Sequence, residues 1–471
     1  MAHALTLLLE SPVLIAAIFI SGIGGTFQFG FHISVLTSPS SFIKELVNTT
    51  CLQRYSISLE QWEVTLIWSF IVSIFCIGGL LGSLCAGRLS SAYGRKRCLL
   101  LNNLFAIGGA GMMLLSKTAM SFEMIMVGRF LYGINAGVGL SVHTMYLVEC
   151  APKRLRGIVG VSVATFLSMG KFLGQLLGIS ELLGTEDRWP WLLGFSGATA
   201  LLQLVTLPLL PESPKYLLLD RGDCQGCEKA IHRLWGSRDH SAEVEEMLLE
   251  HASLKGVRSH TVLDLILDKA IRWQLLTILV AFTTLQFSGI NAVYLYSFDV
   301  FRAAGIPTHQ LRYVALGTVT LGLLTLTLYL QIQVSWMPYC SMVLIFIFIF
   351  FFSSGPAGVT VALPGEIFNQ SFKSAAFTIG CTLNWLGLFL LGMLFPLIVA
   401  NLDYFCFLIF FIFCFLSGVF VWYNVPETKN CTIMEITAAF QRMHPNRGSS
   451  GEGKTRSPEP SHIKACTTTK F

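Results

Sequence analysis

The stretch at positions 64–87, VTLIWSFIVSIFCIGGLLGSLCAG, decides the fold class of this chain. It runs for 24 residues without a charged side chain, and a helix needs about 20 predominantly apolar residues to cross the hydrocarbon core of a membrane. Four basic residues follow closely: Arg88, Arg95, Lys96 and Arg97. An apolar stretch of this length with a basic flank predicts a helix that crosses a membrane and ends at its surface.

Further stretches of the same kind bring the number of predicted spans to eleven. They run roughly over 12–34, 64–87, 98–117, 123–147, 157–180, 189–210, 273–298, 314–333, 338–364, 375–400 and 404–424. The composition agrees, because 53% of the residues are hydrophobic and 13% are charged, against about 25% charged in an ordinary soluble domain. We therefore expect an all-α polytopic membrane protein.

One long polar interruption divides the predicted spans into two groups. We expect an N-terminal transmembrane half at 1–210, a cytoplasmic loop with short helices at 211–272, a C-terminal transmembrane half at 273–426 and a cytoplasmic tail at 427–471. The net charge of +5 is modest, and the basic residues lie in short loops rather than in one patch. This distribution argues for membrane orientation and against a nucleic-acid partner.

The basic loops also predict the orientation. Cytoplasmic loops carry an excess of lysine and arginine, so the loops near 88–97 and 153–156 should be cytoplasmic, together with the N-terminus. The loop between the first two spans is then extracellular, and its sequon Asn48-Thr49-Thr50 predicts a glycan on Asn48. Basic residues after the last span favour a cytoplasmic C-terminus. Eleven crossings would place that terminus outside, and the conflict centres on residues 314–336.

Six short motifs stand in a fixed order around the predicted spans. They are GRLSSAYGRKR at 87–97, GRF at 128–130, ECAPKRLRG at 149–157, PESPKYLL at 211–218, QFSGIN at 286–291 and VPETK at 425–429. In this order they resemble the sugar-porter branch of the major facilitator superfamily, and specifically the facilitative glucose transporters. The similarity is closest to the class of that family that includes the type eleven and fructose carriers, and it covers residues 12–440 apart from one gap.

The resemblance implies a major facilitator fold, with two six-helix halves around a site near the membrane midplane, alternating access, and uniport without a cofactor or metal. It also implies a cytoplasmic gate, in which acids and bases at helix ends pair across the halves when the inner side is closed. The matching positions are Arg95, Glu149, Arg156, Glu212, Glu366, Lys373 and Glu427.

A sugar is a neutral ring of hydroxyls, so its reversible binding needs amides, hydroxyls and aromatic faces rather than full charges. The seventh predicted span and an Asn-Trp pair in the tenth offer such groups. The resemblance implies that the glutamine and asparagine of the seventh span contact the sugar and that the Asn-Trp pair forms part of the cavity wall. The expected substrate-binding residues are Gln286, Asn291, Tyr294, Tyr296, Asn384 and Trp385. The expected partners are therefore a hexose such as glucose or fructose, and the lipid bilayer, most simply that of the plasma membrane.

Lys171 is a further candidate for the substrate-binding set. It lies near the middle of the fifth predicted span, on the same helical face as Ala164 and Gln175. A lysine at this depth is costly and indicates a functional site. One interpretation is that Lys171 attracts an anionic substrate such as an organic acid. The other is that its side chain reaches the membrane surface or pairs with an acid.

The largest departure from the family is the gap. One stretch, 314–333, stands where the family has a span, a short basic loop and another span, so about thirty residues are missing and the second half lacks about one span. This gap explains the conflict in orientation, and it predicts weak or absent transport. Two other functions stay open: a non-transporting truncated relative that binds partners, and a carrier of a small organic anion.

Other chemistry is not expected. No nucleophile, base and acid converge in the sequence, and it lacks the GxxxxGK[ST] phosphate loop of ATP-driven pumps, so we expect neither an enzyme nor a primary pump. Cys224 and Cys227 have no second pair and no nearby histidine ligands, which argues against a metal site. His32 in the first span is interpreted as a packed polar residue rather than a proton carrier.

Overall fold

The structure is a computed structural model. It describes residues 11–152, 155–236, 261–268, 271–289, 370–402, 406–426 and 433–444, with a few isolated positions between 244 and 368. In these ranges the regular secondary structure is helical, and six helices are long and apolar enough to cross a membrane. They are Pro12–Ser34, Gln61–Tyr93, Arg95–Ser116, Phe122–Cys150, Trp189–Leu209 and Ser371–Val399. The expected all-α class is confirmed, while the predicted spans at 314–333 and 338–364 lie outside the continuous described ranges.

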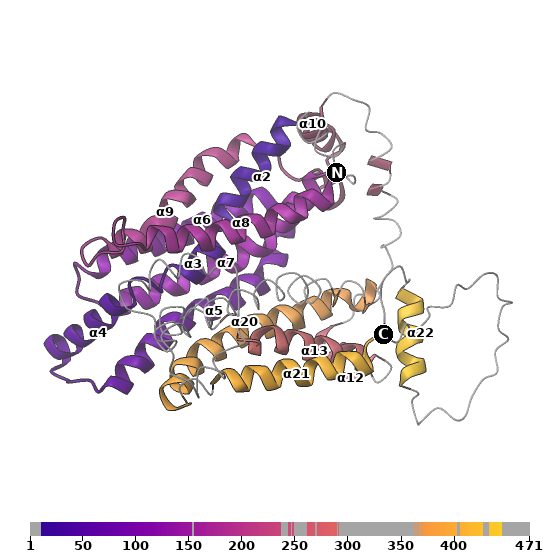
Figure 1. The fold of residues 1–471 in the computed structure, drawn as a ribbon. Helices are drawn as coiled ribbons and strands as arrows, with labels where there is room; N and C mark the ends of the chain where they lie inside the picture. The colour runs from indigo at the N-terminus through magenta and orange to yellow at the C-terminus, as the bar shows by residue number, and fades with distance from the viewer. Residues whose placement is uncertain are drawn as a thin grey trace. The chain divides into compact units, whose positions relative to one another are not determined.

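The described helices fall into two compact units. Unit 1 contains α2 (Pro12–Gly24), α3 (Thr26–Ser34), α4 (Ser40–Tyr55), α5 (Gln61–Tyr93), α6 (Arg95–Ser116), α7 (Phe122–Cys150), α8 (Arg156–Leu177), α9 (Trp189–Thr206), η1 (Leu207–Leu209), η2 (Tyr216–Asp220) and α10 (Cys224–Trp235), all labelled or traceable in Figure 1. Unit 2 contains α12 (Val262–Leu267), α13 (Arg272–Phe287), α21 (Cys406–Asn424) and α22 (Ile433–Met443). The long α20 (Gln370–Leu402) belongs to unit 2 up to Asn384 and to unit 1 from Trp385 onward.

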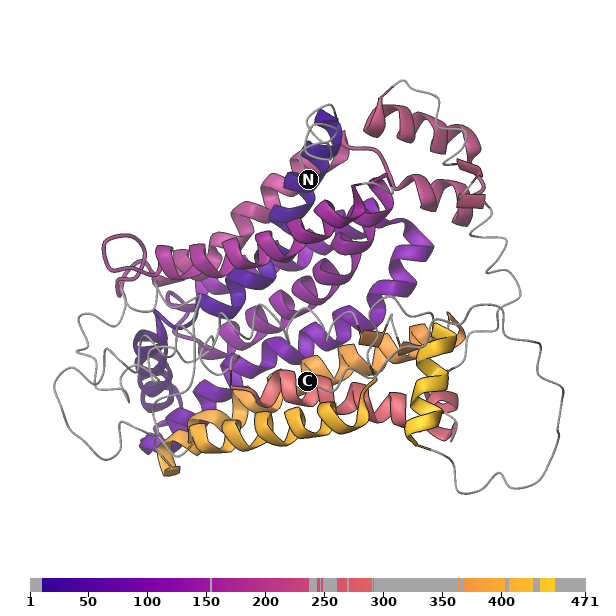
Figure 2. The same cartoon turned by 45° about the vertical axis from the view of Figure 1, so that its right-hand side comes forward.

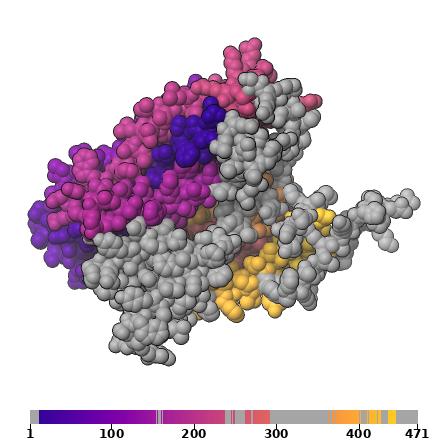
Figure 3. Space-filling view, turned by 45° about the horizontal axis from the view of Figure 1, so that its top comes forward, coloured from indigo at the N-terminus to yellow at the C-terminus, as the bar shows by residue number. Residues whose placement is uncertain are grey.

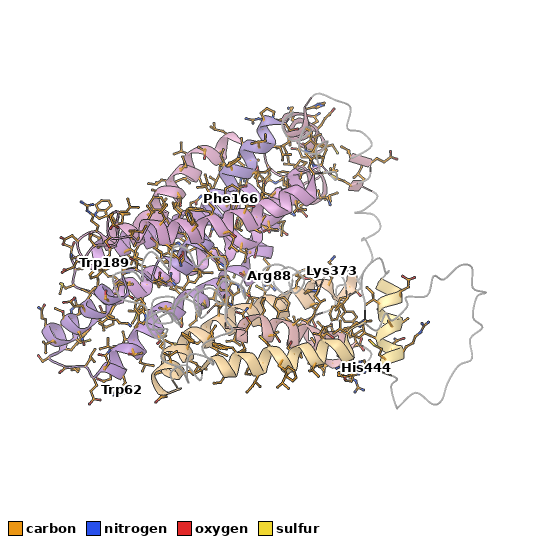
Figure 4. All side chains as sticks on the ribbon, in the orientation of Figure 1. Trp62, Arg88, Phe166, Trp189, Lys373 and His444 are labelled. Atoms are coloured by element: carbon orange, nitrogen blue, oxygen red, sulfur yellow. The ribbon has the colours of Figure 1, made fainter. Side chains whose placement is uncertain are left out.

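Successive long helices of unit 1 run in opposite directions, so their termini gather at two ends of the unit. Figure 4 shows Trp62 and Arg88 at opposite ends of α5. The main helix pairs are α5 with α7, α6 with α7 and α9, and α3 with α8. We call the end at which α5 stops and α6 starts the Arg95 end.

Glycines allow α5 and α7 to approach closely. A Cβ atom added at Gly133 would lie 2.1 Å from the backbone oxygen of Phe75, and one added at Gly137 would lie 2.2 Å from the backbone oxygen of Gly79. Neither position can therefore carry a side chain while the helices stay in place. Small residues that let two backbones meet are a common way to pack helices in a membrane, where burial of apolar surface does not drive association.

A helix occupies the segment between the first two spans, where the sequence analysis expected only a loop. The apolar face of α4 is buried against the rest of unit 1 and consists of Ile43, Leu46, Val47 and Cys51. Their spacing of three and four residues is that of one helix face. Asn48 points away from this face and is exposed.

The long polar interruption contains short helices in its described part. In α10 the Asp223 side chain accepts a hydrogen bond from the Gly226 N–H and caps the helix. The buried face of α10 includes Cys227 and Ile231, which pack with Leu218 of η2. Burial raises the pKa of the Cys227 thiol to about 11, so at neutral pH this thiol stays protonated and unreactive.

Unit 2 is built around α13. This helix lies beside α21 and the first part of α20 (Figure 2), with the ring of Phe287 stacked on that of Phe413 at 5.1 Å. At the other end of α13, the Trp273 ring stacks on the His444 ring at 3.7 Å, and Figure 4 labels His444 where α22 ends. Gln274 also donates a hydrogen bond to the Thr437 hydroxyl of α22 at 3.3 Å. These contacts attach α22 to the start of α13.

The glycine contacts predict an asymmetry between two substitutions. Gly137→Val should destabilise the protein by about 1–3 kcal/mol, because the added side chain would force α5 and α7 apart. Gly111→Val in α6 is the matched control, since a Cβ added there meets nothing within 4 Å. Thermal unfolding of the purified full chain, followed by size exclusion after heating, measures both. Equal melting temperatures for the two variants would contradict this close packing.

Candidate functional site

Arg95 is the centre of an ionic network at the Arg95 end. Its Nε lies 2.9 Å from Glu149 Oε2, and its Nη2 donates to Glu149 Oε1 at 3.0 Å. The Nη1 atom lies 2.6 Å from a carboxylate oxygen of Asp220. The guanidinium carbon also sits 4.9 Å from the centre of the Tyr216 ring. An ion pair that includes a hydrogen bond, here from Nη2 to Glu149 Oε1, is stronger and more directional than a contact of charges alone, so Arg95 holds the start of α6 against the end of α7.

The acids of the network also bind the segment that follows α9. Glu149 accepts a hydrogen bond from the Ser213 hydroxyl. Glu212 accepts hydrogen bonds from the backbone N–H groups of Lys96 and Ser213, each at 2.9 Å. The Glu212 carboxylate thus lies at the first turn of α6, where the helix dipole and the unpaired N–H groups favour negative charge. The network therefore ties the start of α6, the end of α7 and the segment 211–220 together.

Gly94 makes room for this arrangement. Its φ of +98° lies in the region that disfavours residues with a side chain, and it lets α5 turn directly into α6. A Cβ atom added there would lie 2.6 Å from Glu212 Oε2. Gly94 is therefore required both by the turn and by the approach of Glu212.

The structure brings three of the predicted gate residues together: Arg95, Glu149 and Glu212. Arg156 begins α8, and Lys373 lies half-buried near the start of α20 in unit 2, where Figure 4 labels it. The side chain of Arg156, and both Glu366 and Glu427, lie outside the described residues. A role of this set in gating stays a prediction.

Three partners in the network were not predicted from the sequence: Ser213, Tyr216 and Asp220. All three follow Glu212 in the segment 211–220. Ser213 and Tyr216 belong to the PESPKYLL motif itself, and Asp220 lies just beyond it. The motif thus held the signal, but the backbone turn at η2 decides which side chains return to Arg95.

The predicted binding residues Gln286 and Asn384 form a polar pair in unit 2, in which Asn384 is half-buried. Gln286 Nε2 donates to Asn384 Oδ1 at 2.8 Å, and the Gln286 side chain is almost completely buried. Two residues earlier, the Thr284 hydroxyl donates to the Ser417 hydroxyl at 2.7 Å. Neutral amides and hydroxyls thus connect α13 to α20 and α21.

Trp385, the next residue on α20, is buried among aromatic rings of unit 1. Its ring lies 5.5 Å from that of Phe29 and 6.0 Å from that of Phe75. The indole N–H donates to the Ser83 hydroxyl at 2.9 Å. A Cβ added at Gly79 would lie 2.2 Å from the Trp385 ring, so α5 accommodates this indole only because position 79 is glycine.

The structure places the other predicted binding residues only in part. Lys171 is half-buried in the middle of α8, and its backbone oxygen accepts a hydrogen bond from the Ser34 hydroxyl at 2.8 Å. Asn291 is half-buried and helical. Tyr294 and Tyr296 lie outside the described residues. A role in substrate binding therefore stays a prediction for the whole set.

A buried arginine inside unit 1 was not among the predicted site residues. Arg129 of α7 donates to the backbone oxygens of His32 at 3.0 Å and Val72 at 3.2 Å, and lies over the Phe75 ring at 4.5 Å. The His32 ring stacks on that of Tyr132 at 4.0 Å. Arg129 therefore links α3, α5 and α7, and its presence in the GRF motif was the available signal.

In the described part of the chain, no three His, Cys, Asp or Glu residues are grouped as metal ligands.

Loss of the central cation should weaken the network strongly. Arg95→Gln leaves two acids without their partner, and removal of one member of a buried ion pair typically costs about 3–5 kcal/mol. Asp220→Asn should cost less, because the Asp220 side chain is 37% exposed while that of Glu149 is 13% exposed. Melting temperatures of the purified variants measure this order. Lys117→Gln is the control, since its pair with Asp187 is at the surface. If the Arg95→Gln protein had the same melting temperature as this control, the stabilising role of the network would be contradicted.

Comparison with known proteins gives a consistent assignment. The family model described as "Sugar (and other) transporter" matches residues 17–331 and 312–440. Solute carrier family 2, facilitated glucose transporter member 11 of Homo sapiens is 38% identical over 481 residues, which cover 95% of this chain and 97% of that protein. Member 9 of Homo sapiens is 40% identical over 461 residues, with 91% and 85% covered. Member 5 of Equus caballus is 38% identical over 466 residues, with 92% and 93% covered.

Solved structures share the fold. The inward open conformation of the xylose transporter XylE from E. coli has a TM-score of 0.72 with 19% identity, covering 90% of this chain and 99% of that chain. Its partially occluded inward open conformation has a TM-score of 0.68 with 21% identity, covering 88% and 100%. XylE is a protein of the major facilitator superfamily, so the expected fold is confirmed. The chain is a multi-pass membrane protein and not an enzyme, and it belongs to the family of sugar transporters that includes the facilitated glucose transporters.

Proposed function

We propose that this protein carries hexoses such as glucose or fructose across the plasma membrane by uniport with alternating access. The observation that carries the proposal is the hydrogen bond between the buried Gln286 and the half-buried Asn384. Relatives at 38–40% identity are named facilitated glucose transporters, which supports the choice of substrate. We also propose that both termini are cytoplasmic and that the exposed Asn48 carries an extracellular glycan.

The chemistry of the pair suits a substrate that must bind and leave. Each amide can exchange its partner for a sugar hydroxyl without leaving a buried polar group unpaired, and a neutral hydrogen bond contributes only about 1 kcal/mol net. The exchange therefore costs little in either direction. A charged pair in the same place would bind too tightly or would need a counter-charge on the substrate.

The ionic network supplies an element that can hold one state closed. We propose that the contacts of Arg95 with Glu149 and Asp220 are intact when the cytoplasmic side is closed and weaken when it opens. The excess of basic residues near 88–97 supports a cytoplasmic position for the Arg95 end.

A shortened second half remains part of the proposal. The alignment to human member 11 is 481 residues long but uses 95% of this 471-residue chain, or about 447 residues, which leaves about 34 positions without a counterpart here. The family model also matches in two pieces that overlap at 312–331. Both findings support a missing segment of about thirty residues near that overlap. The same observation favours the second candidate function, a non-transporting relative that binds partners.

A third possibility is a carrier of a small organic anion. The position of Lys171 favours it, because a half-buried lysine in the middle of α8 would attract negative charge. Lys171→Ile separates this possibility from hexose uniport. If the variant selects among sugars and organic anions as the unmodified protein does, Lys171 has no role in substrate choice.

Uptake of labelled glucose and fructose into liposomes that carry the purified protein tests the proposal. We expect saturable uptake above that of empty liposomes, weakened by the shortened second half, with no change when a proton gradient is collapsed. Gln286→Leu should lower the uptake efficiency at least about tenfold, because it leaves Asn384 and a substrate hydroxyl without a partner. Gln274→Leu is the matched control, since Gln274 is a second buried, hydrogen-bonded glutamine of α13.

The outcomes separate the candidates. Uptake in the control variant together with loss in Gln286→Leu supports hexose uniport through this pair. Uptake that vanishes with the proton gradient contradicts uniport. Folded protein with no uptake of either sugar contradicts the proposal and favours the non-transporting relative.

A further inference from the structure

Two cations bind three successive backbone oxygens where α9 ends. Lys96 Nζ donates to the oxygens of Pro208 at 2.8 Å and Leu210 at 2.5 Å. Arg233 of α10 donates to the Leu209 oxygen at 2.5 Å. The last carbonyls of a helix carry partial negative charge and have no partner inside the helix. The end of α9 therefore holds both cations at fixed positions on the outside of unit 1.

Arg97 adds a third positive charge to this place. The Lys96 side chain is close enough to Glu212 to be attracted by it, and close enough to Arg233 and Arg97 to be repelled by their charges. Arg97 and Arg233 are exposed, and none of the three forms a salt bridge within the part of the chain that the structure describes. Glu212, the neighbouring acid, has its Oε1 directed to two backbone N–H groups. We call Lys96, Arg97 and Arg233 the α9-end cluster.

An apolar ridge runs along unit 1 from this cluster. On α6, Leu101 and Leu104 follow Arg97 at spacings of four and seven residues, which is one helix face, and they are 53% and 57% exposed. On α9, which packs against α6, Leu201 and Val205 are exposed at a spacing of four residues, and Leu209 of η1 is exposed just beyond them. Leu209 is the residue whose backbone oxygen Arg233 binds. The ridge thus begins at the cluster and extends toward the middle of both spanning helices.

We propose that the α9-end cluster and this ridge bind an anionic phospholipid. The cluster lies at the end of two membrane-spanning helices, which is the depth of the phosphate groups in a bilayer. Arginine pairs with phosphate through two parallel hydrogen bonds, and each basic residue near an anionic membrane surface contributes roughly a fivefold gain in affinity. The ridge is continuous with the cluster and offers apolar surface to the acyl chains. Figure 3 shows α9 in magenta to pink at the surface of unit 1, beside the indigo α2.

The arrangement favours a lipid over a soluble phosphate. A free anion would contact the three charged side chains alone and would make no contact with the apolar ridge. A phospholipid uses both, because its charged and apolar parts are joined in the same order as the cluster and the ridge. Contact with Arg97 and Arg233 would also link α10 to the start of α6 through one ligand, next to Arg95.

Lipid retention by the purified full chain tests the inference. The protein is placed in mixed micelles with labelled phosphatidylserine or phosphatidylcholine, and the lipid bound per protein is measured after removal of free lipid. We expect a preference for phosphatidylserine that falls at high salt. The double variant R97Q/R233Q should lose about 30-fold in affinity for phosphatidylserine if the two charges act additively. The matched control R88Q/R188Q removes two exposed arginines elsewhere on unit 1 and should keep the preference.

Two arms use the unmodified protein, so the inference can fail even if a variant does not fold. Glycerophosphoserine has the same head group without acyl chains and should compete poorly. If it competes as well as the whole lipid, the ridge contributes nothing and the assignment to a lipid is wrong. Equal retention of both lipids by the unmodified protein, or equal loss in both double variants, would also overturn it.

Discussion

The ion pair between Arg95 and Glu149 is the interaction on which the Arg95 end of unit 1 depends. It joins the start of α6 to the end of α7, and it orients Glu149 so that the Ser213 hydroxyl can reach the same carboxylate. Glu212 then meets the first N–H groups of α6, because Gly94 leaves room for it. Lys96, one residue after Arg95, reaches the end of α9 from this position. A single ion pair with little solvent exposure thus aligns three helix ends.

The two kinds of polar contact in the structure suit two different tasks. The network around Arg95 is charged, and separating its partners costs several kcal/mol unless other groups or water replace them. Such a contact can hold one conformation until substrate binding or release favours another. The pair of Gln286 and Asn384 is neutral, and its partners can be exchanged for hydroxyls at little cost. In our account the charged contacts select the conformation and the neutral ones bind the sugar.

Sequence reasoning reached the individual residues more easily than their contacts. Arg95, Glu149 and Glu212 could be predicted because each stands in a short motif at a helix end. Asp220 could not, because its approach to Arg95 depends on the backbone turn of η2, which no spacing rule describes. Gln286 and Asn384 were predicted separately as binding residues, but they lie 98 residues apart, and only the packing of α13 against α20 shows that they bind each other. The helix α4 was missed because its apolar face is short and lies between polar residues.

The apolar spans were the most predictable part of the fold, since membrane thickness sets their length. The close approach of α5 and α7 was less predictable. Gly133 and Gly137 mark a face that can pack tightly, but the sequence does not say which helix packs there. The Trp385 indole illustrates the same limit, because its place depends on Gly79, more than 300 residues away.

Counterflow is the sharpest test of alternating access, because it requires a carrier that exposes one site in turn to each side of the membrane. Liposomes with the purified protein are loaded with unlabelled fructose or glucose and diluted into a trace of the labelled sugar. We expect the label to accumulate transiently above its equilibrium level and then to decline as the internal sugar leaves. Uptake that rises only to equilibrium, or no uptake by protein shown to be folded, would contradict alternating access and identify the chain as a member of the family that does not act as a carrier.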